Sequence, residues 1–593
     1  MDLLSRPITI LKTFLKNKPL LSRFFLLVIF PLMVYAPSLF NGFVGDDNVL
    51  IVTNSFYNSG ANLPRLFSKE YNAVSNDYFI NLKKDKGTGS VAYRPVLSLT
   101  YFIDSWLWGK NPFGYHAHNL FYHIANTLLV YLIASQIFPA GALLTAVLFS
   151  LHPVQTEAVC AVGYRADLLA CFFTLAAFYA WLRARKKGRG ELFYALSAAS
   201  FFLAVFSKES AVMFPVAVLI YKMLFPAAIP NKKFIRQMAG YLIIAGFYLY
   251  IYFIVFPNTT LGSSSSLMGA GGIRFALRLW REYLSALLFP WTVTVLPALY
   301  APPVSPWGHP ATLLDIAVFL LSLGFLAVCW RKNKKIFFCA LWFIVFYIPV
   351  SSIFFNVNPM AYRFIYLPSV GMFFLIAFGL TEWGRRAQSP KTARLVVAAA
   401  VGLYAACTFP AVFLWKNNFT SASEWVRKFP EHHKGYSVLA REYYRRGNFR
   451  EAGLLYQKSL ARGSRNPNDV YELAVCYLTQ DNAKKAEGLL TDLIRDYPAY
   501  ADALVTLAGI RRHHGDLPGA IALARQAVRS APNHITYYYV LIDNLLSAGN
   551  LKEAQALLEQ SRKIFGESAD QKKLDAWFAQ RIPNKNFQTE EFP

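Results

Sequence analysis

The chain has 593 residues, of which 55% are hydrophobic and 16% aromatic, and its formal net charge is +26. This composition is too apolar for an ordinary soluble domain, and the length allows two or more domains. The basic residues gather in short clusters between apolar runs, so they indicate membrane topology and no nucleic-acid partner. The six cysteines show no CxxC spacing, which argues against a zinc or redox site.

Apolar runs recur along the first 416 residues. A membrane-spanning helix needs about 20 apolar residues. Eleven runs qualify, of which we interpret the first as an uncleaved helix: 20–40, 113–137, 140–156, 166–183, 191–206, 209–226, 236–257, 311–330, 336–355, 363–383 and 393–415. We therefore expect an all-α membrane domain over residues 1–416, whose first outer loop, 41–112, contains short helices.

Basic clusters predict the orientation of these helices. With the N-terminus in the cytoplasm, four gaps on the cytoplasmic side hold clusters of Lys and Arg, at 183–189, 222–236, 331–335 and 385–394. The fit requires that 273–296, an amphipathic stretch with three arginines, lies in the interface without crossing. The C-terminus is then outside, and the Ser-rich stretch 258–272 is expected to be a flexible outer loop.

A 34-residue repeat follows the membrane domain. Small residues recur at Ala452, Ala486, Ala520 and Ala554, directly after turns such as GNFREA and AGNLKEA. This period and pattern are typical of tetratricopeptide repeats (TPRs), in which stacked helix pairs bury a shared core. We expect a solenoid of about four repeats over 417–565, then a capping helix and tail over 566–593. Such arrays usually bind polypeptides in a groove, and a structural spacer is the alternative.

Ionisable side chains that are unusual in an apolar domain all fall near the predicted outer face. They are Asp46, Asp47, Arg94, His116, His123, His152, Glu157, Arg165, Asp167, Lys208, Glu209 and Arg363. Charged groups near hydrocarbon are costly and tend to mark function. A chance distribution would show no preference for one face, so we expect an outward-facing active site.

This set can carry out group transfer. A carboxylate can accept the proton of an attacking hydroxyl, and arginine or lysine can stabilise a leaving phosphate. The chain has no P-loop, GxSxG elbow or HExxH motif. Because nucleotide sugars are cytoplasmic, an outward-facing transferase would use a lipid-linked donor.

Structural roles are the alternative for each residue. Asp47 could cap a helix end, His116 could be a buried packing histidine, Glu157 and Arg165 could form a bracing ion pair, and Arg363 could be an interface anchor. Asp167 is expected to cap the fourth helix. Lys208 and Glu209 could snorkel to the interface.

Six motifs precede the repeats. In chain order they are GDD, RPxxxLT, NPxGxHxxNxxxH, HPVxTExVxxxxxRADLL, KE and YRFIYLPSxG. In this order they resemble the transmembrane-and-TPR O-mannosyltransferase family of the GT-C superfamily, over residues 35–565. The resemblance implies inverting transfer from a polyprenyl- or dolichyl-phosphate sugar, typically mannose, to a hydroxyl on a protein. It implies neither a metal nor another cofactor.

Carried over to this sequence, the resemblance makes Asp46 or Asp47 the catalytic carboxylate that acts as base, with a slight preference for Asp46. It makes Arg94, Arg165, Lys208 and Arg363 candidates for binding the donor phosphate, and it implies that His116, His152, Glu157 and Glu209 shape the sugar and acceptor pocket. Gly45 and Tyr164 depart from the family pattern, which makes mannose less secure than the reaction class.

Our first hypothesis is an O-glycosyltransferase whose TPRs recruit the protein acceptor. Transfer to a lipid or polysaccharide, a membrane-anchored TPR scaffold and a transporter are the alternatives. We expect a bacterial inner membrane with the TPR domain in the periplasm, or the endoplasmic reticulum membrane if the source is eukaryotic.

Overall fold

The computed structural model describes residues 19–67, 93–185, 190–226, 230–255, 270–294, 305–351, 360–387 and 389–581, and the regular elements in these ranges are helical. The basic N-terminal segment, most of the Ser-rich loop and the C-terminal tail lie outside the described residues. The chain forms two compact units, Met1–Trp425 and Val426–Pro593. The first unit thus extends past the expected boundary at 416 and includes most of the short helix α18 (Asn418–Lys428).

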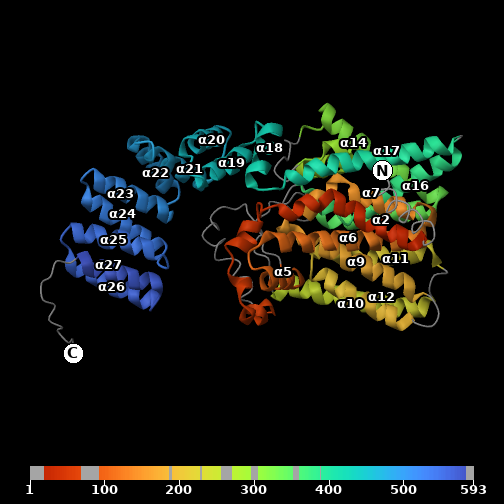
Figure 1. Ribbon diagram of the computed structural model, residues 1–593, viewed down its shortest axis with the longest axis horizontal. Helices are drawn as coiled ribbons and strands as arrows, with labels where there is room; N and C mark the ends of the chain where they lie inside the picture. The colour runs from red at the N-terminus through yellow and green to blue at the C-terminus, as the bar shows by residue number, and fades with distance from the viewer. Residues whose placement is uncertain are drawn as a thin grey trace, which may run out of the picture. The chain divides into compact units, whose positions relative to one another are not determined.

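The first unit is a bundle whose long helices run side by side (Figure 1). These helices are α2 (Pro19–Tyr35), α5 (Pro95–Trp108), α6 (Pro112–Ile137), α7 (Ala142–Leu151), α9 (Arg165–Ala184), α10 (Gly190–Val205), α11 (Phe214–Leu224), α12 (Asn231–Tyr250), α13 (Ala270–Leu288), α14 (Pro310–Lys332), α15 (Lys334–Tyr347), α16 (Ser369–Arg386) and α17 (Pro390–Phe413). Helix α6 lies centrally and packs against α2, α7 and α9.

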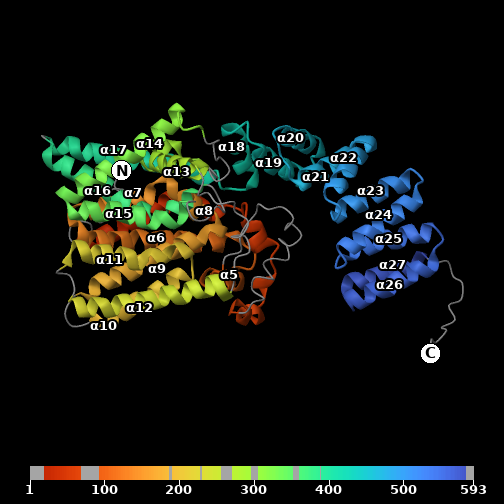
Figure 2. The same cartoon turned by 180° about the vertical axis from the view of Figure 1, so that it is seen from behind.

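Short helices connect these elements. They are η1 (Ala36–Phe40), η2 (Asn48–Val52), η3 (Phe56–Asn58), η4 (Gly60–Phe67), η5 (Pro139–Gly141), η6 (Pro153–Gln155), α8 (Thr156–Cys160), η7 (Val162–Tyr164), η8 (Glu209–Met213), η10 (Ile251–Val255), η12 (Pro290–Thr292), η14 (Ile348–Val350) and η15 (Tyr362–Ile365). Several of them occupy the described part of the first outer loop. In Figure 2, α5 and α8 lie at the same end of the bundle.

Local sequence signals explain where many helices begin. Proline opens α6, α14 and α17, where its missing N–H costs no helical hydrogen bond. Asn111 caps α6 by accepting from the Phe113 N–H. Asn333 caps α15 by accepting from the N–H groups of Lys335 and Ile336. Each cap lies close after the end of the preceding helix, so the turns between α5 and α6 and between α14 and α15 are short.

The structure does not show eleven full crossings. Six described stretches are long and apolar enough to span a membrane, namely Leu20–Phe40, Pro112–Ile137, Val162–Ala184, Asn231–Val255, Pro310–Lys332 and Pro390–Phe413. A seventh is available if Pro139–Leu151 and Pro153–Cys160, which are bent by 53°, are one span.

The other four expected spans are shorter or more charged. They hold α10, α11 and α15, with 16, 11 and 14 residues, and α16, whose last turn carries two arginines. An 11-residue helix rises roughly 17 Å, about half of the hydrocarbon core. The apolar run 209–226 looked continuous, but its first five residues form the separate turn η8. Within the described residues we therefore correct the count to six candidate spans, or seven with the bent pair.

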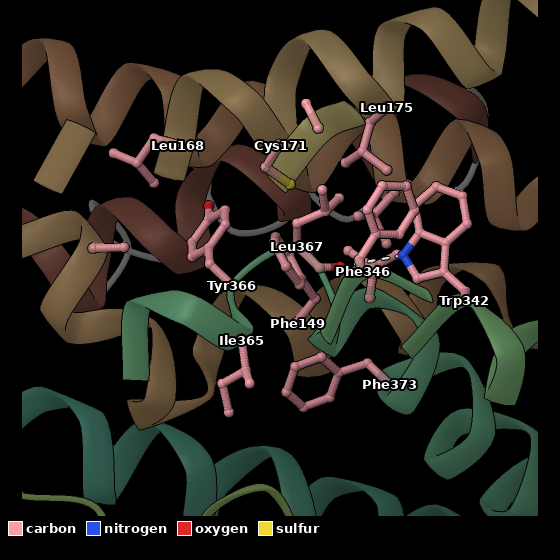
Figure 3. Packing of buried hydrophobic residues seen from close by; sticks show 14 of the residues in the cluster. Phe149, Leu168, Cys171, Leu175, Trp342, Phe346, Ile365, Tyr366, Leu367 and Phe373 are labelled. Atoms are coloured by element: carbon pink, nitrogen blue, oxygen red, sulfur yellow. Dashed lines mark hydrogen bonds between the residues drawn. The ribbon is translucent and has the colours of Figure 1, made fainter. Parts of the chain in front are cut away.

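Aromatic packing fills the middle of the bundle (Figure 3). Phe149, Tyr366 and Phe373 meet edge to face, and the Trp342 indole donates to the Leu367 carbonyl at 3.2 Å. Lipid tails are as apolar as leucine, so close packing and buried hydrogen bonds, more than transfer from water, hold such helices together. This core supports η15 and α8, which carry charged residues at one end of the bundle.

The second unit is a stack of helix pairs. The pairs are α19 (His433–Arg445) with α20 (Phe449–Ala461), α21 (Pro467–Leu478) with α22 (Ala483–Asp496), α23 (Ala501–His513) with α24 (Leu517–Ser530), and α25 (Ile535–Ser547) with α26 (Leu551–Phe565), followed by α27 (Ala569–Arg581). The repeated alanines at 452, 486, 520 and 554 are fully buried, as their small size requires. The predicted TPR helical repeats are confirmed.

Candidate active site

Asp47 fastens the loop between α2 and α5 to the rest of the bundle. Its carboxylate accepts from the backbone N–H of Val44 at 3.0 Å, of Val162 at 3.2 Å and of Gly163 at 2.5 Å. The side chain is 1% exposed. The preceding turn uses Gly45 at φ +57°, a conformation that residues with a Cβ rarely adopt. Asp47 thus places its neighbours against η7.

Burial raises the pKa of Asp47 to about 7, although three backbone N–H groups act to lower it and neighbouring Asp46 raises it further. The group therefore titrates near neutral pH. Such a carboxyl is suited to holding a loop, and less suited to acting as an always-ionised base.

Asp46 has the opposite surroundings. Its side chain is exposed, and among the described residues its carboxylate makes no hydrogen bond or ion pair. Its backbone carbonyl accepts from Val49 and Leu50, which fixes the start of η2. The carboxylate interacts electrostatically with Tyr164 and Arg363. The described structure therefore presents an exposed carboxylate without an ion pair that interacts electrostatically with a buried cation.

Arg363, in η15, forms an ion pair with Glu157 of α8. The Glu157 carboxylate also accepts from the N–H groups of Tyr362, at 2.7 Å, and Arg363, at 3.3 Å. The guanidinium lies 3.8 Å from the centre of the Tyr164 ring, close enough for a cation–π contact. The sequence alternative in which Glu157 pairs with Arg165 is wrong.

Two more cations lie beside this pair. Lys208 donates to Asp167 at 2.5 Å, and Arg94 makes a two-pronged contact with Glu209 at 2.8 to 3.1 Å. The Lys208 ammonium and the Arg363 guanidinium each lie 4.9 Å from the centre of the Phe364 ring, so one aromatic residue adjoins both. The Arg94 and Glu209 side chains are 25% and 34% exposed, which makes them the most accessible of these pairs.

The expectation that Asp167 caps the fourth predicted membrane helix, which is α9, is wrong. Asp167 lies in the first turn of α9, where its carboxylate accepts from Lys208. The residue at the cap position is Tyr164, which makes no side-chain capping bond. An acidic residue in a first turn still suits the helix dipole.

The structure does not bring Arg165 to this group. Its side chain is 0% exposed and donates to the Asn119 side chain, the Thr100 hydroxyl and the Tyr115 carbonyl at 2.7 to 3.0 Å. It also forms an ion pair with Asp104. These contacts join α5, α6 and α9, and they enclose the guanidinium.

His116 and His152 are also enclosed. His116 in α6 approaches the Gly42 carbonyl at 3.3 Å. His152 stands at the bend between α7 and η6, where its Nδ1 accepts from the Val154 N–H and its ring packs edge to face on Tyr404. Both are almost fully buried, so their geometry fits the packing alternative better than a sugar pocket.

Sequence reasoning missed Asp104 and Phe364. Asp104 is fully buried in α5 and pairs with His118 as well as with Arg165. A lone carboxylate within the apolar stretch PVLSLTYFIDSWLW was the signal that could have found it. Phe364 carried no signal beyond its place in YRFIYLP. Among the described residues, no three His, Cys, Asp or Glu side chains converge as a metal site would require.

The architecture defines a polytopic, all-helical membrane protein with charged pairs at one end of its bundle and a C-terminal TPR domain. The family model described as dolichyl-phosphate-mannose-protein mannosyltransferase matches residues 104–255, and tetratricopeptide-repeat models match 437–491, 480–535 and 512–577. Residues 104–255 thus resemble a protein mannosyltransferase, the C-terminal part resembles TPR proteins, and the chain as a whole is distantly similar to proteins named protein O-mannosyl-transferase.

Two human relatives show how low the sequence identity to these proteins is. Protein O-mannosyl-transferase TMTC1 of Homo sapiens is 26% identical, over 76% of this chain and 56% of its own length. Protein O-mannosyl-transferase TMTC3 of Homo sapiens is 24% identical, over 89% of this chain and 59% of its own length. The chain thus spans a little over half the length of these relatives. The crystal structure of MamA aligns with 28% of this chain and 92% of its own, at 16% identity and a TM-score of 0.24, too low to support an argument.

Proposed function

We propose that this protein is a membrane glycosyltransferase that moves a sugar, mannose by family, from a polyprenyl- or dolichyl-phosphate donor to a Ser or Thr hydroxyl of a protein. The observation that carries the proposal is the exposed carboxylate of Asp46, which has no ion pair among the described residues and interacts electrostatically with Arg363, together with two further cation–carboxylate pairs. An acid and several cations are what transfer from a sugar phosphate requires.

Asp46 is the general base in this mechanism. The acceptor oxygen attacks the anomeric carbon while its proton passes to the Asp46 carboxylate. The bond between that carbon and the phosphate oxygen breaks, and the lipid phosphate leaves with the electron pair. Attack opposite the leaving group inverts the configuration. Asp47 acts as a positioning residue, because its hydrogen bonds to Val44, Val162 and Gly163 hold the loop that presents Asp46.

Arg363, Lys208 and Arg94 bind the donor phosphate. Arg363 uses one terminal nitrogen on Glu157, and arginine has five N–H donors, so it can serve a second anion. Lys208 has two further N–H donors beside its bond to Asp167. Glu209 and Glu157 keep these cations in position. We assign Arg165 to the framework, since each of its three nitrogens already donates a hydrogen bond within the bundle.

The TPR unit recruits the acceptor polypeptide, and the reaction takes place on the outer side of the membrane. Transfer to a lipid or polysaccharide would leave the TPRs without a part in acceptor recognition. A scaffold or a transporter would leave the unpaired carboxylate unexplained. Support for the outer side comes from the basic turns at Arg331–Lys335 and Arg385–Arg394, which lie at the opposite ends of their helices from the charged pairs.

The test is transfer of radiolabelled mannose from polyprenyl-phosphate mannose to total envelope protein by the purified chain. Asp46→Asn should lower transfer by about 10²- to 10⁴-fold, the usual contribution of a general base. The control is Glu191→Gln, which removes an exposed ion pair on a helix away from the site. Label on protein with wild type and control, and not with Asp46→Asn, supports the proposal.

Wild-type activity retained by Asp46→Asn would refute the assignment of the base. Label that extracts with lipid would favour the lipid acceptor. If a panel of lipid-phosphate sugars gives no label while the protein stays folded, the scaffold becomes the better explanation.

A further inference from the structure

A second charged region lies at the far end of α6. Helix α6 begins beside residues 42–50, which we call the acidic loop because it holds Asp46 and Asp47. The helix runs for 26 residues, roughly 39 Å, to its last residue Ile137. There the turn after α6, the end of α11, the α14–α15 turn and the end of α16 line one open groove. We call it the basic groove and define it by Phe138, Phe225, Phe378, Lys332, Lys334 and Lys335.

The floor of the basic groove is apolar. The rings of Phe138 and Phe378 lie 5.1 Å apart and are half-buried, and Phe225 contributes from the end of α11. These three residues come from parts of the chain that are more than eighty residues apart. Side chains that converge from distant segments make a surface of defined shape, which a single basic loop does not.

The rim of the basic groove is cationic. Lys332, Lys334 and Lys335 are exposed, and among the residues that the structure describes none of them forms an ion pair. Glu382, the carboxylate at this rim, is already paired with Arg385 at 2.5 Å. Several unpaired ammonium groups beside an apolar floor match an amphiphile with an anionic head.

Two exposed tryptophans indicate the depth of the groove in the membrane. Trp330, in the last turn of α14, is 56% exposed, and Trp383, in the last turn of α16, is 45% exposed. Exposed tryptophans of membrane proteins concentrate at the headgroup level. The length of α6 exceeds the roughly 30 Å hydrocarbon core, so its two ends reach opposite headgroup regions. The basic groove therefore lies where lipid phosphates lie.

We propose that the basic groove binds the headgroup of an anionic membrane phospholipid, with the lysines on the phosphate and an acyl chain against the phenylalanines. Topology alone requires basic residues near these helix ends, but it does not require them to surround an aromatic floor built from three segments. The lipid bound here is a structural ligand and is separate from the sugar donor, which needs the other end of the bundle.

Detergent-purified full-length protein tests this with native mass spectrometry and thermal unfolding. We expect phosphatidylglycerol to remain bound and to raise the Tm, and phosphatidylcholine to do neither. The triple variant Lys332→Gln/Lys334→Gln/Lys335→Gln should bind phosphatidylglycerol on the order of 100-fold more weakly, because each juxtamembrane lysine contributes about a factor of five. Replacing all three by arginine should preserve binding and shows whether the turn tolerates substitution.

The matched control is Arg529→Gln/Lys552→Gln/Lys563→Gln, which removes the same charge from exposed positions of the TPR unit and should leave lipid binding unchanged. Equal effects of the two lipids, or wild-type affinity in the groove variant, would overturn the proposal. So would inorganic phosphate that raises the Tm as much as phosphatidylglycerol does, since the ligand would then be a free anion.

Discussion

Asp46 and Asp47 are adjacent and chemically identical, and the backbone gives them different roles. Asp47 points inward to three N–H groups, whereas the Asp46 side chain is exposed and its carboxylate makes no hydrogen bond among the described residues. A sequence shows two acids in a row and cannot say which one turns inward. That distinction follows from the turn at Gly45 and from η7, which is more than a hundred residues away.

The Asp47 carboxyl makes the stability of the protein depend on pH. Its pKa of about 7 in the folded chain lies above the ordinary 3.8, so the folded state keeps a proton that the unfolded state releases. The stability that this proton supplies is present below pH 4 and is lost as the pH rises to 7. Asn does not titrate. We expect the Tm advantage of wild type over Asp47→Asn to shrink between pH 5 and pH 7.5, and a gap that is constant or widens would contradict the assignment.

Gly163 is required by the closeness of η7 to the acidic loop. A Cβ at this position would lie 2.9 Å from the Asp47 carboxylate, 3.2 Å from Leu50 and 3.6 Å from the Asp46 Cβ. Gly163→Ala should therefore lower mannosyl transfer at least about 10-fold by shifting Asp46, with no titratable group removed. Gly402→Ala, in α17 and without close neighbours, is the control and should keep full activity. Equal activity of both variants would show that the loop adapts.

Arg165→Lys separates a framework role from phosphate binding. Lysine keeps the charge but cannot reach Asn119, Thr100 and the Tyr115 carbonyl together. We expect a loss of about 2–3 kcal/mol in stability, since buried acceptors lose their donors. The KM for the lipid donor of the folded fraction should stay unchanged. A KM raised several-fold with an unchanged Tm would return Arg165 to the phosphate site.

At the level of elements, the TPR turns repeat one backbone conformation. Gly447, Gly515 and Gly549 end the first helix of their pairs with φ between +74° and +82°, and Asp481 occupies the same position of the second pair with φ +56°. An L residue pays a penalty in this region that glycine avoids. Asp481 is thus the one departure from glycine at this turn.

Asp481→Gly should stabilise α21 and α22 by up to about 1 kcal/mol, and Gly515→Ala should destabilise the next pair by a similar amount. Hydrogen exchange of these helices in the full-length protein measures both changes. If Asp481→Gly leaves exchange unchanged or speeds it, the aspartate side chain must contribute a local interaction that offsets its backbone strain.

The repeats could be predicted from the sequence, while the bundle could be predicted only in part. A 34-residue period fixes which helices pair, because each repeat contacts its neighbours in order. Apolar runs show which segments are buried in lipid or protein, but not where a helix breaks, as at η8 and at the bend before α8. The ion pair between Glu157 and Arg363 joins residues about two hundred positions apart, and one sequence holds no record of that contact.

At the level of the whole molecule, the helix lengths predict which surfaces share a side. Helix α6 runs from the acidic loop to the basic groove, and α17, with 24 residues, returns the chain to Asn41, whose amide donates to the Val412 carbonyl. We therefore expect the active site and the start of the TPR unit on one side of the membrane and the basic groove on the other.

An impermeant maleimide can test this in sealed inverted vesicles. A cysteine at Ala140, beside the basic groove, should be labelled, whereas cysteines at Ala61 and Lys552 should be protected until detergent is added. The native cysteines in the described chain are buried or half-buried, which keeps the background low. Labelling of Ala61→Cys and Ala140→Cys from the same side would contradict the assigned topology.

The acidic loop is joined to the segment that leads out of the membrane domain. The Gly42 N–H donates to the Lys416 carbonyl at 2.8 Å, and the Gly45 N–H donates to the Asn418 side chain at 2.7 Å. This sets a cut point for protein engineering. A chimaera that receives a foreign repeat array should be joined after Trp425, so that the graft keeps both contacts. A junction at residue 416 would exchange Asn418 and leave the turn before Asp46 without its fastening.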